Sequence, residues 1–298
     1  MKSFTLFLCF LICYCSPFAQ SADSKDNSLL GLTPPGLTPE VFAPGTLCQE
    51  GRNEFGPSFS PDGHVLYFEI DDTLYQTEQT DNEWTPLHQV AGYENSAKKR
   101  IPKISKDGKF YTFGQKGDIY KGGYSKGTFM PAEKMPAPVN SEKFECDFSF
   151  TRNGTIYFCS QRTGTKGQCD VYRSRFVDGH YQEPENLEPF NTPGSECMVL
   201  IHPDEKWIIF TGFNRPDGFG SSDMYISFHL TGDKWTTPKN MGPDYNTSMG
   251  NGPISLSPDG KYFFFVKGID SPAGAHNDIY WVDTRALDQF KMDKCCSP

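Results

Sequence analysis

The hydrophobic pattern of the chain is a short aromatic segment that follows a polar turn, and this unit recurs five times. The stretch "SFSPDGHVLYF" at residues 58–68 returns as "KISKDGKFYTF" from Lys103, "SFTRNGTIYFC" from Ser149, "LIHPDEKWIIF" from Leu200 and "SLSPDGKYFFF" from Ser255. The turn residues Asp62, Asp107, Asn153, Asp204 and Asp259 are separated by intervals of 45, 46, 51 and 55 residues. Intervals of this size are typical of β-propeller blades.

Each repeat continues in the same order after its aromatic segment. A polar loop leads to a second segment that begins with Asp, a hydrophobic residue and Tyr, at Asp118, Asp170, Asp223 and Asp278. An aromatic residue followed by Pro comes next, and four units end on Asn plus a hydroxyl residue: Asn95-Ser96, Asn140-Ser141, Asn191-Thr192 and Asn246-Thr247. Aromatic segments bounded by Gly, Asp and Asn turns predict an antiparallel meander of four short strands per repeat.

The predicted fold class is all-β, a β-propeller of four-stranded antiparallel blades, because stacked blades bury aromatic sheet faces and leave only short edges. Five repeats predict five blades, with six as the alternative if a degenerate blade is hidden. The last repeat lacks its aromatic-Pro strand, whereas residues 36–45 contain a spare Thr-Pro. We therefore expect an N-terminal strand to complete the final blade. The predicted domain is a single propeller over residues 36–290, with a disordered segment at 22–35 and a tail at 291–298.

The first 21 residues predict a secretory signal peptide. Lys2 precedes an apolar run from Phe4 to Cys15, and Pro17 and small residues follow. This run is shorter than the roughly 20 residues that a spanning helix needs, and the mature chain has no longer one. We expect an exported protein, periplasmic or secreted. The net charge of −9 disfavours nucleic acid and anionic membranes as partners. A monomer without a cofactor is expected.

Two segments carry a resemblance to a known family. The stretches "SPDGKYFFF" and "NDIYWVD" in the last repeat, and the pattern Gly, Trp, Pro and Asn within residues 232–240, resemble the WD40-like β-propeller repeats of TolB-type periplasmic proteins. The resemblance covers about residues 36–285 and implies the propeller fold. It implies no single activity, because such repeats occur in binding scaffolds, in accessory parts of cell-envelope complexes and in some enzymes. TolB proteins carry an additional α/β domain before the propeller, for which we expect no room here, so a Tol-like role is not carried over.

Residues that differ between the repeats are the candidates for function, because a residue needed once for chemistry would not be installed five times. Each turn motif begins with Ser, Thr or His. Counting back six positions from that residue gives Glu54, Lys99, Glu145, Glu196 and Asn251. We expect these side chains to form a polar ring at one end of the central channel, with Arg100 and Asp147 nearby. Loop residues Phe213, Phe219 and His276 are further ligand-binding candidates.

The ring allows two interpretations. Carboxylates that face one cavity raise one another's pKa and could act as general acid and base, so Glu54, Glu145 and Glu196, with Lys99 as charge partner, would fit a carbohydrate-active lyase or hydrolase. The spacing singles out no nucleophile or base, however. The favoured interpretation is an exported, non-catalytic scaffold that binds a protein or glycan at the channel mouth.

Seven of the ten cysteines lie beyond the predicted signal peptide. Disulfides are expected in an oxidising compartment. The favoured pair is Cys159–Cys169, across one hairpin. Cys146 and Cys197 occupy matching positions of neighbouring blades and could form a disulfide or remain buried thiols, and Cys48 could join Cys295 at the ring seam. No CxxC pair or Cys/His cluster has zinc spacing, so no metal site is predicted.

Overall fold

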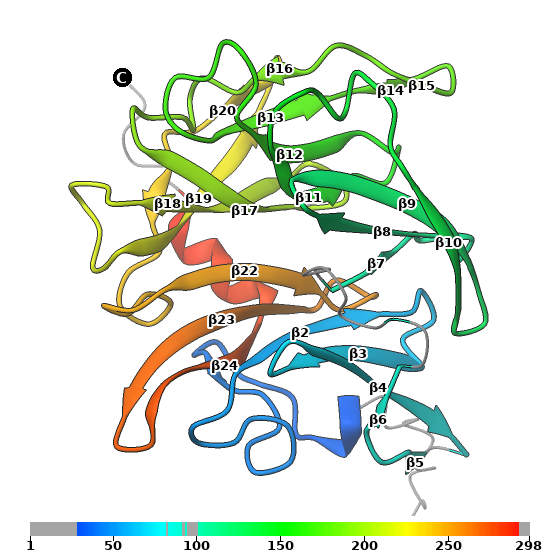
Figure 1. The fold of residues 1–298 in the computed structure, drawn as a ribbon. Coiled ribbons are helices and arrows are strands. Elements are labelled where there is room, and N and C mark those ends of the chain that lie inside the picture. The colour runs from blue at the N-terminus through cyan, green and yellow to red at the C-terminus, as the bar shows by residue number, and fades with distance from the viewer. Residues whose placement is uncertain (1–28, 82, 91–92, 94–100, 292–298) are drawn as a thin grey trace, which may run out of the picture.

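Five antiparallel sheets surround a central channel in the computed structural model, which describes residues 29–81, 83–90, 93 and 101–291 (Figure 1). The chain is a five-bladed β-propeller. The fold class predicted from the repeats is confirmed, and five blades account for all five copies of the turn motif. The predicted signal peptide, residues 1–21, lies outside the described residues.

Each blade runs outward from its innermost strand. Blade 1 contains β2 (Glu54–Phe59), β3 (Val65–Ile70), β4 (Thr73–Thr80), β5 (Glu83–Trp84) and β6 (His88–Gln89); blade 2 contains β7 (Lys103–Ile104), β8 (Phe110–Gln115), β9 (Asp118–Ser125) and β10 (Thr128–Lys134). Blade 3 contains β11 (Glu145–Phe150), β12 (Ile156–Ser160), β13 (Asp170–Ser174) and β16 (Glu185–Asn186), with a hairpin of β14 (Phe176–Val177) and β15 (His180–Tyr181). Blade 4 contains β17 (Ser195–Ile201), β18 (Trp207–Phe213), β19 (Ser222–Leu230), β20 (Lys234–Trp235) and β21 (Lys239–Asn240). Blade 5 contains β22 (Asn251–Leu256), β23 (Tyr262–Ser271), β24 (Gly274–Asp283) and β1 (Glu40–Val41).

The N-terminal strand closes the ring, as the sequence predicts. In β1, Glu40 pairs with Trp281 of β24, so the first strand of the chain is the outermost strand of the last blade (Figure 1). The next residue, Phe42, is completely buried, and its ring centroid lies 5.2 Å from that of Phe264 and 5.0 Å from that of Trp281. Chain segments from the two ends of the sequence therefore share one hydrophobic core.

The segment before β1 departs from expectation in its described part. Residues 22–35 are predicted to be disordered, but Leu29–Gly31 form the short 3-10 helix η1. Leu29, Leu30 and Leu32 pack against the core cluster that contains Phe42. This burial of apolar side chains stabilises the segment from Leu29 to Leu32 against the propeller.

The repeated turn motif caps the connection between the first two strands of a blade. In blade 1, Ser60 Oγ donates to Asp62 Oδ1 at 2.5 Å, and the same carboxylate oxygen accepts from His64 N at 3.1 Å. The equivalent pairs are Ser105 with Asp107, Thr151 with Asn153 and Ser257 with Asp259. Four of the five turns therefore share this structural cap. In blade 4 the Asp204 carboxylate pairs with Arg152 instead, and its backbone N–H donates to His202 Nδ1.

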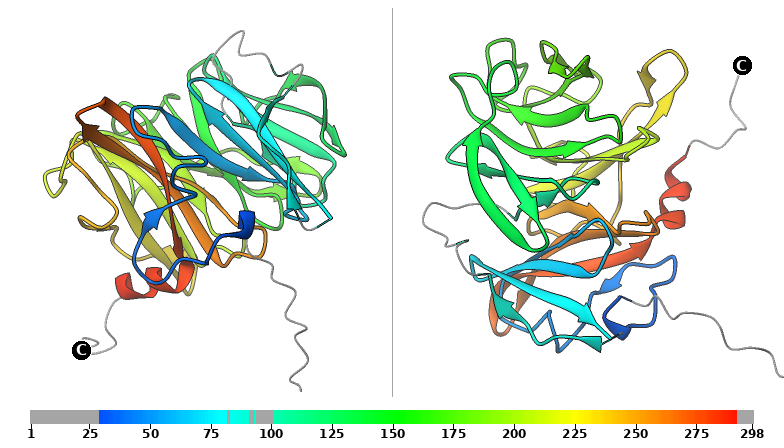
Figure 2. Two further views of the ribbon diagram at one scale, coloured as in Figure 1. Left: turned by 90° about the horizontal axis from the view of Figure 1, so that it is seen from below. Right: turned by 90° about the vertical axis from the view of Figure 1, so that its right-hand side faces the viewer.

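The last helix of the described residues packs against the propeller. The 3-10 helix η2 (Thr284–Phe290) buries Ala286 and Leu287 in the core cluster shared by blades 4 and 5 (Figure 2). Among the described residues, no helix combines the length and apolar character needed to cross a bilayer.

Candidate functional site

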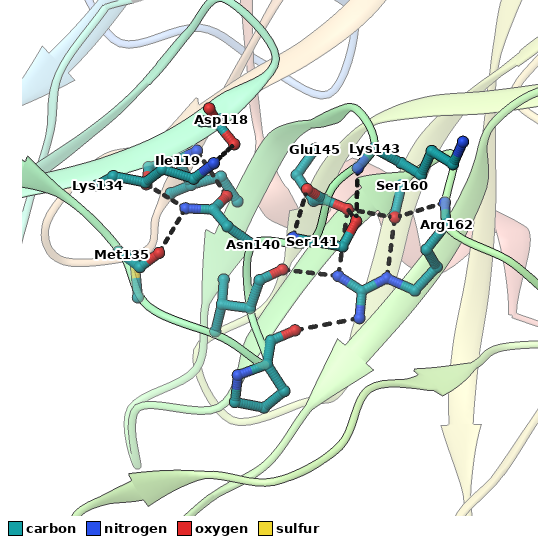
Figure 3. A network of polar contacts seen from close by, with 12 residues as sticks. Asp118, Ile119, Lys134, Met135, Asn140, Ser141, Lys143, Glu145, Ser160 and Arg162 are labelled. Atoms are coloured by element: carbon teal, nitrogen blue, oxygen red, sulfur yellow. Dashed lines mark hydrogen bonds and ion pairs between the residues drawn. The ribbon is translucent and has the colours of Figure 1, made fainter.

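Glu145, one of the three candidate catalytic carboxylates, is the first residue of β11 and has no exposed surface. One carboxylate oxygen accepts from Ser141 Oγ at 2.6 Å, from Ser160 Oγ at 2.8 Å and from Arg162 Nη2 at 3.3 Å (Figure 3). The other accepts from the Ser141 backbone N–H at 2.9 Å. Four donors thus hold this carboxylate in place, which is how a buried charge is retained in a protein interior.

The same arrangement recurs in the next two blades. Glu196 accepts from the backbone N–H of Thr192 at 3.0 Å and from its hydroxyl at 2.6 Å, and lies 3.7 Å from the Arg215 guanidinium. Burial raises the pKa of Glu196. In blade 5, Asn251 accepts from the backbone N–H and the hydroxyl of Thr247, at 3.1 and 3.0 Å. A hydroxyl residue four positions earlier therefore caps a residue at the start of each of three innermost strands, the first residue in β11 and β22 and the second in β17.

The asparagine that precedes each of these hydroxyl residues binds the blade before it. Asn140 accepts from Ile119 N at 2.9 Å and donates to the carbonyls of Ile119 and Met135 at 2.8 Å each (Figure 3). Asn191 and Asn246 bind the backbone of Val171 and Met224 in the same way. Each Asn-hydroxyl pair thus joins the third strand of one blade to the innermost strand of the next.

Glu54 in blade 1 is buried by different partners. Its carboxylate accepts from Arg52 Nε at 2.5 Å and from Gln49 N at 3.4 Å. Desolvation raises the pKa of Glu54 in spite of the Arg52 contact. Glu54 also lies beside the Cys48 thiol and the Asp278 carboxylate, whose ligand atoms are within 4.8 Å of one another.

The predicted ring at the channel mouth therefore needs correction. Glu54, Glu145 and Asn251 are the first residues of innermost strands and Glu196 is the second residue of another, close to where the count along the repeats places them, but at most 2% of each residue is exposed. Their side chains are buried and hydrogen-bonded to the segments that connect one blade to the next, and they do not face solvent. Lys99 and Arg100 lie outside the described residues.

The residues that do line the channel are mostly apolar. Phe55, Met198 and Pro253 surround a cavity of about 90 Å³ together with Lys103 and Asp147. Asp147 is the one channel candidate of the sequence that lies here. Lys103 donates from Nζ to the Phe148 carbonyl, and its burial lowers its pKa to about 8. The cavity is well below the roughly 300–1,000 Å³ of pockets that enclose small ligands.

The loop candidates separate into one exposed residue and two that are less accessible. Phe219 is 52% exposed in the loop of residues 214–221, and Asp223 accepts from its backbone N–H at 2.9 Å. Phe213 is half-buried. His276 is 4% exposed, with Nδ1 3.0 Å from the Gly274 carbonyl and Nε2 3.8 Å from Asp278. Its burial in β24 argues against the predicted role in surface ligand binding.

A larger cavity, about 440 Å³ in volume, lies between the outer strands of blades 3 and 4, and we call it the outer groove. Its lining includes Arg173, Glu185, Glu188, Asp233, Lys234 and Trp235. The repeats do not predict this groove. Trp235 belongs to the aromatic-Pro feature that four of the repeats share, so its place in the repeat gives no sign of a site.

Arg173 organises the charges of the outer groove. It is 3% exposed, donates to Glu185 at 2.6 Å and forms a bidentate pair with Asp233 at 2.8 and 2.9 Å. The Arg173 hydrogen bond lowers the pKa of Asp233 to about 2. Within the described part of the chain, Arg173 Nε and Trp235 Nε1 have no hydrogen-bond acceptor, although both atoms are buried. Both donor atoms lie beneath the surface of the groove, so the parts of Arg173 and Trp235 that line it are their other atoms.

The described cysteines are free thiols. Cys48, Cys146, Cys159, Cys169 and Cys197 form no disulfide in this structure, and Cys295 lies outside the described residues. In the predicted Cys159–Cys169 hairpin, Cys159 faces Val171, so Cys169 is in a diagonal position. Diagonal residues have Cα atoms about 7–8 Å apart, beyond the usual disulfide limit of about 6.8 Å.

No model of a known protein family and no curated protein sequence matches the chain. Solved structures with a similar arrangement of strands include a putative TolB from Agrobacterium tumefaciens, with 19% identity, a TM-score of 0.47 and coverage of 74% of this chain and 72% of that one. A protein described as a glycoside hydrolase has 9% identity and a TM-score of 0.49, with 84% and 91% covered. A gluconolactonase from Xanthomonas campestris has 13% identity and a TM-score of 0.45, with 84% and 87% covered. The propeller fold implied by the sequence resemblance is the fold observed.

Proposed function

We propose that this protein is an exported, non-catalytic β-propeller that binds a neutral oligosaccharide in the outer groove between blades 3 and 4. The observation that carries the proposal is a cavity of about 440 Å³ that is lined by the side chain of Trp235 and by charged residues, among them Glu188 and Lys234. A cavity of this volume is in the range that holds a small ligand. The export signal expected in residues 1–21 supports a ligand met outside the cytoplasm.

The lining offers both kinds of hydrogen-bonding group that a sugar hydroxyl needs. The exposed Lys234 supplies a donor and the exposed carboxylate of Glu188 supplies an acceptor. Hydroxyl groups can donate and accept at once, so a sugar could satisfy both. The other two acids of the groove, Glu185 and Asp233, are already paired with Arg173 and Arg175, and the whole chain carries a net charge of −9. A neutral ligand therefore suits the site better than an anionic one.

The burial of the three candidate carboxylates supports a binding role over the hydrolase or lyase alternative. A general acid or base must come within about 2.6–3.2 Å of the proton that it transfers. Glu145 and Glu196 are completely buried and already accept hydrogen bonds from the caps of their own strands. A substrate would have to open these joints before it reached either carboxylate.

The test is calorimetric titration of the mature protein with a panel of neutral oligosaccharides, followed by two matched variants. Glu188 and Glu183 are both exposed glutamates of the same segment, but only Glu188 lines the outer groove. We expect Glu188→Ala to weaken binding about 5- to 30-fold, equivalent to the loss of one net hydrogen bond to a charged group. Glu183→Ala is the control and should bind like the wild type. Equal affinities of the two variants would place the ligand elsewhere.

A further inference from the structure

Four cysteine thiols converge at the boundary between blades 3 and 4, on the inner side of the sheets. Cys146 comes from β11, Cys159 from β12 and Cys197 from β17, while Cys169 immediately precedes β13. The Sγ atoms of Cys146, Cys159 and Cys197 and an oxygen of Asp147 lie within 4.8 Å of one another. The Cys169 thiol lies close enough to the other three to interact electrostatically with each of them. We call these four residues the thiol cluster.

We propose that the thiol cluster binds one Zn²⁺ ion. Tetrahedral coordination by four cysteines is the usual structural zinc site, with metal–sulfur bonds of about 2.3 Å and hence sulfur atoms about 3.8 Å apart. The Sγ atoms of Cys146, Cys159 and Cys197 already lie within 4.8 Å of one another, so three of the four ligands are near that spacing. Each thiol that binds the ion releases its proton to solvent.

The surroundings suit a thiolate centre that is held rigidly. Cys159 and Cys169 are at most 3% exposed within the hydrophobic core of blades 3 and 4, and the half-buried Cys146 and Cys197 pack against this core. The buried Lys103 ammonium acts electrostatically on Cys159 and Asp147, so it offsets part of the negative charge that four thiolates around Zn²⁺ would carry.

An ion can approach the cluster from the central channel. Asp147 and Met198 follow Cys146 and Cys197 in sequence, and both line the channel cavity. Asp147 Oδ2 lies 3.4 Å from Cys146 Sγ. A carboxylate between the channel and the thiols is well placed to receive a hydrated cation before the thiols replace its water.

One shared centre also accounts for the placement of all four thiols better than separate disulfides do. Cys159 directly faces Cys146 across the two strands, whereas Cys169 is diagonal to Cys159. A disulfide joins two thiols at a time, and it leaves unexplained why Cys197 of the next blade points at the same place. Blades 1 and 5 have Phe55 and Gly252 at the position of Cys146, so the cluster is specific to one blade boundary.

The experiment measures metal content and thiol state of the full mature chain, purified without chelators from an exported fraction. We expect one zinc per chain by elemental analysis and four thiols that react with an alkylating agent only after the metal is removed. Replacement of zinc by Co²⁺ should produce the thiolate-to-cobalt charge-transfer absorption and the visible bands of a tetrahedral cobalt site. Copper in place of zinc, or two disulfides with no bound metal, would overturn the proposal.

Variants then assign the ligands. Cys197→Ser should weaken Co²⁺ binding by more than the roughly 10- to 100-fold that loss of an outer-shell partner causes, and should reduce the charge-transfer absorption. If Cys197→Ser does not fold, Co²⁺ binding is measured instead in Cys146→Ser, which changes the other half-buried cysteine. Cys48→Ser is the control, because Cys48 is a buried thiol outside the cluster. Loss of the metal in Cys48→Ser with retention in both cluster variants would overturn the proposal and move the site to Cys48, Glu54 and Asp278.

Discussion

Replacement of Glu145 by Gln tests whether the buried carboxylates hold the blades together. The substitution preserves the shape of the side chain but removes its charge and one acceptor. In the wild type, the two oxygens accept from the Ser141 backbone N–H, two hydroxyls and Arg162. In Glu145→Gln, the amide nitrogen must face at least one of these donors, which is then left without an acceptor inside the protein.

The expected loss of stability follows from these contacts. One hydrogen bond to a charged group contributes about 1.5–3 kcal/mol, and the loss of a buried ion-pair partner costs about 3–5 kcal/mol when nothing else compensates. Arg162 keeps its bonds to the carbonyls of Pro138 and Val139, so the second term is reduced. We expect Glu145→Gln to lower the free energy of unfolding by about 2–4 kcal/mol, or Tm by about 5–15 °C for a chain of this size.

The assay is urea unfolding followed by tryptophan fluorescence, with Glu142→Gln as the matched control. Glu142 is an exposed glutamate three residues earlier, so its substitution should change stability by less than about 0.5 kcal/mol. A double-mutant cycle with Ser141→Ala should give a coupling of about 0.5–3 kcal/mol, because Ser141 caps the same carboxylate. Equal stability of Glu145→Gln and Glu142→Gln would refute the structural role.

Three further predictions concern contacts elsewhere in the propeller. Asn191→Ala should lower the free energy of unfolding by about 2–3 kcal/mol in urea unfolding, because it removes the side-chain acceptor of the buried Val171 N–H; a loss below about 0.5 kcal/mol would contradict this role. Phe42→Ala should cost about 3–5 kcal/mol by the same assay, because Phe42 fills the seam core, whereas Leu37→Ala, at a residue 60% exposed, should cost little; similar losses would argue against closure by β1. The folded-state pKa of Asp233, about 2, lies below its ordinary value of 3.8, so its pairing with Arg173 stabilises the fold above about pH 4 and is lost as the pH falls toward 2. Asp233 is 46% exposed, so this contribution should stay under about 1 kcal/mol, and Asp233→Asn should remove it from the pH dependence of the urea midpoint; an unchanged pH profile would show that the pair contributes nothing.

The repeated features of the sequence predict the fold because each copy specifies the same local structure. The pair of Ser60 and Asp62 forms the same turn as Ser257 and Asp259, and these turns set the beginning and end of the paired strands. The missing outer strand of the last repeat predicts β1, since an unpaired strand edge needs a partner. Local hydrogen bonding and strand pairing thus suffice for the architecture.

The environment of Glu145 and Glu196 was harder to predict, although the alignment of repeats placed both residues at the start of an innermost strand. A register gives the position along a strand, but which side chains face the channel depends on the backbone conformation. Asp147 and Met198 have positive φ angles of 41° and 51°, and the strand pairing shifts at both positions. The usable signal was the hydroxyl residue four positions earlier, Ser141 or Thr192, which indicates a cap.

The thiol cluster has no linear signature. Its four members lie on separate elements, so the spacing between them reflects loop lengths instead of metal geometry. The outer groove is likewise formed by Arg173 of blade 3 and Asp233 of blade 4, which are 60 residues apart in the sequence. Sites of this kind depend on how neighbouring blades pack, which a repeat alignment does not describe.

The most direct test of a binding role is a thermal-shift screen of the mature protein against neutral oligosaccharides, with product analysis of every ligand that raises Tm. A ligand that binds only the folded state must raise Tm, by an amount that grows with its concentration relative to Kd. We predict at least one such ligand, recovered intact after prolonged incubation. Suppose instead that the wild type cleaves the ligand and that a folded Glu145→Gln or Glu196→Gln variant does not. This result would contradict the non-catalytic role and would show that the buried glutamates take part in catalysis.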